Sequence, residues 1–153
     1  MKYFTIPELT RSATASKKGI DNTPSTEVKT HLIELIENLL DPLRYQWGEY
    51  CKRKGLGSGA IIVSSGYRCP ALNRAVGGVA SSAHLGGWAA DTVPGNGRMT
   101  DYKRWILNEF IPNNPQIKFD QIILEKSRTS QWVHIAIRDL RGRQRQKAFS
   151  LNV

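Results

Sequence analysis

Two histidines and one aspartate of this sequence are suited to binding a metal ion. His84 lies in SSAHLGGWAAD with Asp91 seven residues further on, and His134 lies in QWVHIAI. A catalytic zinc ion takes three protein ligands from imidazole nitrogens and carboxylate oxygens and leaves its fourth position to water. Gly86 and Gly87 permit a tight path after His84, so that Asp91 can return to the same ion. The sequence therefore predicts one zinc ion bound by His84, Asp91 and His134.

The segment around His84 also carries a family resemblance. SSGYRCPALNRAVGGVASSAHLGGWAAD resembles the motif of the zinc D-alanyl-D-alanine carboxypeptidase family, in which Ser-x-His is followed by Gly and then by Ala-x-Asp. Trp132-Val133-His134 is similar to the family's late histidine ligand, and YFTIPELTRSATA, GIDNTP and FDQIILE resemble its phage and prophage members. The motif positions in this chain are Ser82, His84, Gly87, Ala89 and Asp91.

The resemblance implies a zinc peptidase that hydrolyses D-amino-acid-containing bonds in the stem peptides of bacterial peptidoglycan. It implies that Arg68 binds a substrate carboxylate or stabilises the oxyanion, although an arginine that only ties down its loop is the alternative. Ser82 is expected to orient a ligand by a hydrogen bond rather than to attack the substrate. Tyr67 and Trp132 are expected beside the substrate or just behind the ligands, with simple packing as the alternative for Trp132.

A general base is also required to take a proton from the attacking water. Several family members have an acidic residue three positions before the last histidine, but Gln131 holds that position here and cannot transfer a proton. Glu125 is the substitute that we predict. If the two late strands pair so that Glu125 and His134 share a face, Glu125 can serve, whereas the other register excludes it. Asp120 is the weaker candidate.

The elements that must position these residues begin with a helix. Apolar residues recur at helical spacing over 28–43, and Pro42 should kink this helix or end its first part. His31 lies on it and is expected to be structural or exposed. Residues 60–63 are apolar and, apart from Ala60, β-branched, which predicts a buried strand. The apolar residues of the helix are Val28, Leu32, Leu35, Ile36, Leu39 and Leu43.

The remaining sequence predicts loops around the site and a hairpin behind it. Residues 64–97 are rich in Gly, Ser and Ala, which predicts loops apart from a short helix over 70–76. A second helix is expected over 102–110, ended by Ile111-Pro112. Residues 119–125 and 132–137 predict an antiparallel hairpin. Together these elements predict a small α+β fold with a central antiparallel sheet, flanking helices and the zinc site on the sheet and its loops.

Length and charge limit the organisation of the chain. Its 153 residues suit one domain over 1–153, with an N-terminal arm over 1–20 packed against it and a basic C-terminal tail over 138–153. The net charge of +9 favours contact with an anionic cell envelope, and the tail is either a solvated surface or a docking site for polyanions. The sequence has no helix-turn-helix pattern and no motif of interleaved aromatic and basic residues, so no nucleic-acid partner is expected.

Cysteine usage and the first residues indicate where the protein is made. Cys51 and Cys69 are expected to be free thiols, and no apolar stretch near the N-terminus is long enough for an export signal or a membrane span. We expect a monomer that is synthesised in the cytoplasm and acts at the cell wall or in the periplasm if it is lytic. The alternative is a non-catalytic relative that binds cell wall or forms part of a phage particle, which the Gln131 departure keeps open.

Overall fold

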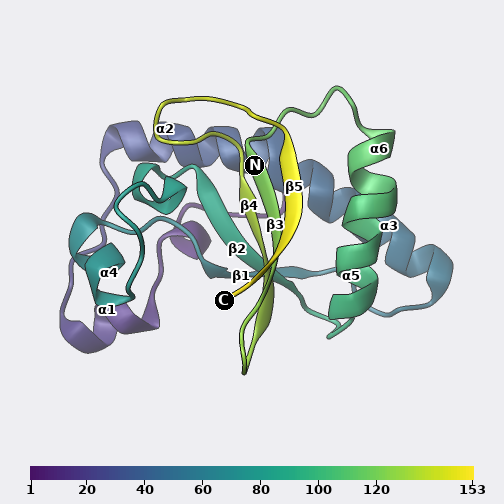
Figure 1. Cartoon of the computed structure of the whole chain (residues 1–153), viewed down its shortest axis with the longest axis horizontal. Helices are drawn as coiled ribbons and strands as arrows, with labels where there is room; N and C mark the ends of the chain where they lie inside the picture. Colours follow the sequence, from purple (N-terminus) through teal and green to yellow (C-terminus); the bar gives the residue numbers. More distant parts are fainter.

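A long helical segment from Thr26 to Lys54 lies behind the sheet in the computed structural model, which describes residues 1–153 (Figure 1). It consists of α2 (Thr26–Leu35), the π-helical turn η2 (Ile36–Leu40) and α3 (Asp41–Lys54). Ser25 begins it by accepting a hydrogen bond from the N–H of Val28. The predicted helix is therefore confirmed, and its apolar stripe is buried at Leu32, Leu35, Ile36, Leu39 and Leu43. No helix of the protein combines the length and the apolar character needed to cross a membrane.

Two prolines lie inside helical segments without ending them. A proline has no N–H to donate and its ring clashes with the carbonyl four residues earlier. Before Pro42, the N–H of Asp41 bonds to the carbonyl of Ile36, five residues back, and this wide turn lets the helix continue. A wide turn of the same kind precedes Pro112, because the N–H of Ile111 bonds to the carbonyl of Ile106. This second helical segment consists of α5 (Met99–Trp105), η4 (Ile106–Phe110) and α6 (Ile111–Asn113). The prediction that the second helix ends at Ile111-Pro112 was therefore wrong by one residue, because α6 continues to Asn113.

Five strands form one sheet in the order β1-β2-β4-β3-β5. All neighbouring strands are antiparallel except β3 and β5, which run parallel. The combination of a mostly antiparallel sheet and packed helices confirms the α+β fold, and β3 and β4 form the predicted hairpin. The strands are β1 (Ile61–Ser65), β2 (Ala89–Pro94), β3 (Gln121–Lys126), β4 (Gln131–Ala136) and β5 (Lys147–Asn152).

The two faces of the sheet have different roles. Side chains at alternate positions, such as Ala90, Ile122 and Val133, are buried in the hydrophobic core beneath the helices. The opposite face carries Asp91 and His134, which are paired across β2 and β4. Because one face is closed by the core, any ligand of the polar side chains must approach from the other face.

Three expectations about strands need correction. β2 lies in the segment expected to be loops, because pairing with β1 and β4 on both sides outweighs the weak strand preference of its small residues. β1 is an edge strand rather than a buried one, and Ile62 is 49% exposed. The segment 138–153, expected only as a basic tail, contains a strand, because its last part pairs with β3 as β5.

The N-terminal residues lie against the body through two buried side chains, Phe4 and Leu9. The N–H of Tyr67 donates to the carbonyl of Leu9 at 2.7 Å, which ties this segment to the loop after β1. Short helical elements surround that loop at the left of Figure 1. They are η1 (Pro7–Leu9), α1 (Ala13–Lys18), α4 (Pro70–Ala75) and η3 (Ala83–Gly86).

Candidate metal centre

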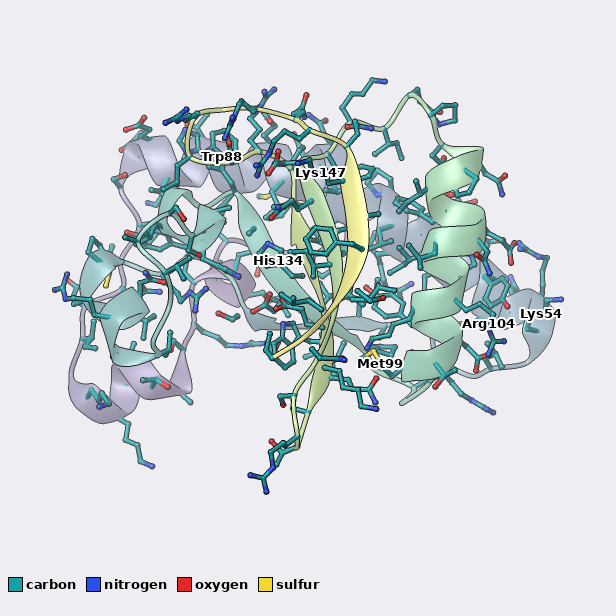
Figure 2. The ribbon with its side chains drawn as sticks, viewed as in Figure 1. Lys54, Trp88, Met99, Arg104, His134 and Lys147 are labelled. Carbon is teal, nitrogen blue, oxygen red and sulfur yellow. The ribbon has the colours of Figure 1, made fainter.

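Three side chains from three different elements converge on one point of the open face. Asp91 on β2 lies directly across from His134 on β4, and His84 comes from η3. The Oδ1 atom of Asp91 is 3.3 Å from His84 Nε2 and 3.0 Å from His134 Nδ1. Ligand atoms around a tetrahedral zinc ion lie about 3.3 Å apart when each bond is about 2.0 to 2.1 Å long. The structure thus brings together all three predicted ligands, and His134 lies near the middle of the sheet in Figure 2.

The orientation of His84 is fixed from behind. Its Nδ1 atom lies 2.7 Å from the carbonyl oxygen of Gly66, which can only accept, so Nδ1 carries the proton and Nε2 is free to bind a metal. Ser82 begins η3 by accepting a hydrogen bond from the N–H of His84 at 3.3 Å. Gly87 ends η3 at φ 75°, and a Cβ there would lie 2.9 Å from a methyl group of Val28. The glycine therefore allows the chain to turn back toward Asp91.

The donor set is suited to a cation between its members. With the proton of His84 on Nδ1, a lone pair on Nε2 faces the carboxylate oxygen of Asp91, so two acceptors meet. Burial lowers the pKa of His84, although Asp91 raises it, and a proton is therefore a poor occupant of this position. Burial by itself would raise the pKa of Asp91, but His84 and His134 bring it below the ordinary value. Two imidazoles and an ionised carboxylate fit a zinc ion.

The carbonyl that holds His84 is in turn supported by residues whose role the sequence did not reveal. A Cβ on Gly66 would lie 2.2 Å from the carbonyl oxygen of Leu9, so only glycine allows the N-terminal segment to pack here. The Asn22 side chain donates to the carbonyls of Thr10 and Tyr67 at 2.8 and 3.0 Å. It also accepts from the N–H of Cys69 at 2.8 Å. Asn22 lies in the GIDNTP segment. The resemblance of that segment to family members was the one signal in the sequence that could have indicated its role.

Glu125 lies on the same face as the ligands. It pairs with Trp132, while Ile123 pairs with His134, which is the register that the base assignment requires. The indole N–H of Trp132 donates to Glu125 Oε2 at 2.9 Å and fixes the carboxylate. Gln131 pairs with Lys126 and points to the opposite face, where it accepts a hydrogen bond from Lys103 at 2.9 Å. An acidic residue at position 131 would therefore face away from the metal ligands in this strand register.

Arg68 extends from the loop after β1 toward the same place. Its Nη2 atom donates to the hydroxyl of Ser82 at 3.4 Å, and its buried Nε–H has no partner within the protein. Burial lowers the pKa of this guanidinium, while the negative charges of Asp91 and Glu125 raise it. Ser82 thus contacts both Arg68 and the His84 turn, as expected of a residue that orients its neighbours.

All of the predicted site residues except one line a single cleft of about 820 Å³. The exception is Tyr67, whose ring belongs to the hydrophobic core and borders a separate hollow next to Arg68. The predicted residues that share the cleft are Arg68, Ser82, His84, Asp91, Glu125, Trp132 and His134. The arrangement therefore places a metal site, a carboxylate and a guanidinium around one solvent-accessible space.

Asp120 also borders the cleft but is already paired. Arg145 binds it through Nε at 2.8 Å to Oδ1 and through Nη2 at 2.9 Å to Oδ2. With both oxygens held by one guanidinium, this buried carboxylate is a poor base. It fastens the C-terminal segment to the sheet instead.

His31 and Trp88 form a support outside the cleft. Their rings stack 3.7 Å apart, and His31 Nδ1 lies 2.7 Å from the carbonyl oxygen of Gly86. Trp88 thereby packs against α2 rather than lining the cleft, and Figure 2 shows it well above His134. His31 is a structural residue, as expected, and it holds the turn that carries His84.

Comparison with known proteins supports the interpretation of this geometry. A family model described as Peptidase M15 matches residues 2–136. The matched range contains the three ligands together with Arg68 and Glu125, and it ends before β5. A search of curated proteins found no match.

Proposed function

The chain belongs to the peptidase M15 family of zinc-dependent metallopeptidases, and from this premise we propose that it hydrolyses D-amino-acid-containing peptide bonds of bacterial peptidoglycan. The substrates are the stem peptides of the wall, and the action is that of a carboxypeptidase or an endopeptidase. One zinc ion on His84, Asp91 and His134 is the cofactor.

One observation carries this proposal: the three donor atoms share an open cleft with Glu125 and Arg68. A structural zinc site is closed by four protein ligands, whereas three ligands leave a position open for chemistry. A site that only stabilised the fold would need neither an oriented carboxylate nor a buried guanidinium with an unpaired N–H. The surroundings of the site therefore favour catalysis over a purely structural role.

Glu125, Trp132 and Arg68 have separate roles in the proposed reaction. A bound zinc ion supplies Lewis-acid activation of water and of the peptide carbonyl. Glu125 accepts the proton of the attacking water and passes it to the leaving amine. Trp132 holds one carboxylate oxygen, which leaves the other free for this transfer. Arg68 binds the substrate carboxylate or the developing oxyanion through donors directed into the cleft.

The test is incubation of the purified, zinc-loaded protein with defined muropeptides, followed by mass spectrometry of the products. We expect a cut next to a D-amino acid and no cut in a matched peptide made only of L-amino acids. Glu125→Ala and His84→Ala should abolish the cut, whereas Glu49→Ala on the exposed side of α3 should not. Intact substrates with the wild-type protein would contradict the proposal, and binding to purified cell wall without cleavage would favour a non-catalytic cell-wall protein.

The substrate also implies a place of action, because peptidoglycan lies outside the cytoplasmic membrane. We include in the proposal that the protein acts at the wall as a lytic enzyme of phage or prophage type. Support comes from the segments that resemble phage members and from the net charge of +9, which favours an anionic envelope. Three basic residues of the C-terminal segment, Arg138, Arg143 and Arg145, each pair with an acidic residue of the body or tail.

A further inference from the structure

A second hollow lies next to the cleft of the metal centre, and the N-terminal segment forms one side of it. It has a volume of about 280 Å³, and both Arg68 and Asp91 line it as well as the cleft. We call this space the side hollow. Most of its other lining residues come from two segments, 11–14 and 64–67. A group bound there would therefore lie beside the metal ligand Asp91.

Hydrogen bonds of the backbone place Arg11 at the side hollow. The carbonyl of Leu9 accepts a hydrogen bond from the N–H of Tyr67 at 2.7 Å, which joins the N-terminal segment to the loop after β1. The N–H of Arg11 itself donates to the carbonyl of Pro7 at 3.0 Å. On the other side of Arg11, the side chain of Ser12 caps the first turn of α1. Arg11 therefore stands on a backbone that is fixed relative to the loop carrying Arg68, and α1 lies below α4 at the left of Figure 1.

The side hollow carries more positive than negative charge. Arg11 and Arg68 supply two guanidinium groups, and the one carboxylate in the lining is that of Asp91, which belongs to the metal site. The arginines that form ion pairs in this protein are Arg104, Arg138, Arg143 and Arg145. Neither Arg11 nor Arg68 is among them, so an anionic group in the side hollow would meet two guanidinium groups without ion-pair partners.

The guanidinium of Arg68 is also incompletely hydrogen-bonded. Its buried Nε–H has no partner within the protein, and its Nη2 atom reaches the hydroxyl of Ser82 at 3.4 Å. Burial lowers the pKa of Arg68, which means that the fold bears a cost for removing this cation from water. A carboxylate is suited to offset this cost, because it accepts two parallel N–H bonds from one guanidinium.

The remaining lining fits an amino-acid residue better than a bare ion. Hydroxyl groups that can donate hydrogen bonds lie on one part of it, and apolar side chains lie on another. The charges alone would suffice for an inorganic anion, whereas the apolar part can also contact the carbon atoms of a residue that bears a carboxylate. The hydroxyl-bearing residues are Ser12, Thr14, Ser64 and Ser65, and the apolar side chains beside them are those of Leu72 and Val76.

We propose that the side hollow binds a carboxylate of the peptide substrate and that Arg11 is the specificity-determining residue that supplies its second guanidinium. The inference rests on the proposed peptidase function and adds to it a preference for substrates with a carboxylate next to the scissile bond. Two sources carry this chemistry, the free end of the peptide and an acidic side chain. The N-terminal segment, expected only to pack against the body, then contributes a residue to the site.

The test compares acid and amide forms of the same peptide with the full, zinc-loaded chain. One pair of peptides differs at the chain end, which is a free carboxylate or a carboxamide. The other pair has a blocked end and differs next to the scissile bond, where it carries D-glutamate or D-glutamine. For the acid of one pair we expect Arg11→Gln to raise KM about tenfold with kcat nearly unchanged, because hydrogen bonds to a charged group are lost. The amide of that pair should show the same KM with both proteins.

Two further variants control for charge and geometry. Arg74→Gln removes the same charge from an exposed position of α4 outside the side hollow and the cleft, so it should keep the wild-type KM for every peptide. Arg11→Lys keeps the charge but loses the planar fork, so its KM for the acid should lie between those of the wild type and Arg11→Gln. The pair that responds identifies the source of the carboxylate. A response of the terminal pair supports removal of an end residue, and a response of the other pair supports cleavage within a chain.

Direct binding separates this inference from the proposed function. In a Glu125→Gln background, calorimetry measures the Kd of the same four peptides without turnover, and Arg11→Gln should weaken binding of the responding acid about tenfold. If the wild type cleaves peptides but Arg11→Gln changes neither KM nor Kd, the inference fails and the peptidase function stands. If the wild type cleaves nothing, the function fails, while the Kd values of acid and amide still decide whether the side hollow binds a carboxylate. An equal loss for the acid and the amide of both pairs would make Arg11 a structural residue and overturn the inference.

Discussion

Glu125 and His134 lie on the same face of neighbouring strands, offset by two residue pairs, because Glu125 pairs with Trp132 and Ile123 pairs with His134. The carboxylate that shares the face of the metal ligands therefore comes from β3 and not from the residue three positions before His134. Gln131 is compatible with catalysis for this reason, since its side chain belongs to the helix-covered face. The register of one hairpin thus decides which acidic residue can serve as the base.

Replacing Glu125 by Gln removes the base and keeps the shape of the side chain. We expect kcat to fall by about 100-fold to 10,000-fold, the usual contribution of a positioned general base. Zinc content, measured by mass spectrometry, should equal that of the wild type because Glu125 is not among the three ligands. Glu49→Gln serves as the matched control, and a Glu125→Gln variant with wild-type kcat would show that another group takes the proton.

Removing the metal should affect both activity and stability. A chelator should abolish hydrolysis and lower the melting temperature, because a metal that binds only the folded chain stabilises it. Asp91→Asn should lose the metal and show no melting shift on addition of zinc. Asp101→Asn, which alters a carboxylate at the helix α5, should respond to zinc like the wild type. A zinc-dependent shift that persists in Asp91→Asn would rule out this ligand set.

The metal-free protein should become less stable in acid. Burial lowers the pKa of His84 in the folded chain below its value of about 6.5 in the unfolded chain. Below pH 6.5 the unfolded chain therefore binds the extra proton first, and the free energy of unfolding falls as the pH falls. One such proton contributes at most about 1.4 kcal/mol per pH unit. Urea unfolding between pH 7.5 and 5.5 measures the slope, which should be smaller in His84→Gln; an equal slope in the two proteins would contradict the prediction.

His31 should influence metal binding without touching the metal. His31→Ala removes the stack on Trp88 and the hydrogen bond to the carbonyl of Gly86, so the turn that carries His84 loses its outer support. We expect zinc affinity to fall about tenfold, at the lower end of the effect of residues that orient metal ligands. His31→Phe keeps the stack but loses the hydrogen bond. Its zinc affinity should lie between those of the wild type and His31→Ala in a competition titration with a chromogenic chelator. Equal zinc affinity in all three proteins would make His31 a packing residue only.

The sequence was most informative where chemistry or periodicity limits the choice of residue. His84, Asp91 and His134 could be selected because few side chains bind zinc, and the long helix could be placed because its apolar residues repeat at helical spacing. The strand that carries Asp91 could not be placed from the sequence, because Ala89, Ala90 and Asp91 have little strand preference of their own. Pairing with β1 and β4 makes that segment a strand, and such pairing is not visible in a local pattern.

The support of the site was hidden for a related reason. Asn22 connects three segments through its side-chain amide, and the carbonyl of Gly66 orients His84, but neither contact leaves a periodic signal in the sequence. The C-terminal residues were interpreted through their arginines as a basic tail. Their alternation of Phe149, Leu151 and Val153 with smaller or polar residues was the signal that indicates a strand.

The two wide helical turns before Pro42 and Pro112 determine how their helices would respond to the loss or gain of a residue. Each residue of a regular helix advances the side-chain direction by about 100°, so a single extra residue in a turn redirects everything that follows. Ile36–Leu40 holds one residue more than a regular turn, so a deletion there would leave Leu43, Trp47 and Cys51 facing the core, whereas a deletion in the regular turns of α3 would rotate the residues that follow it. The irregularity that looks like a local defect therefore sets the phase of the helix behind the whole sheet.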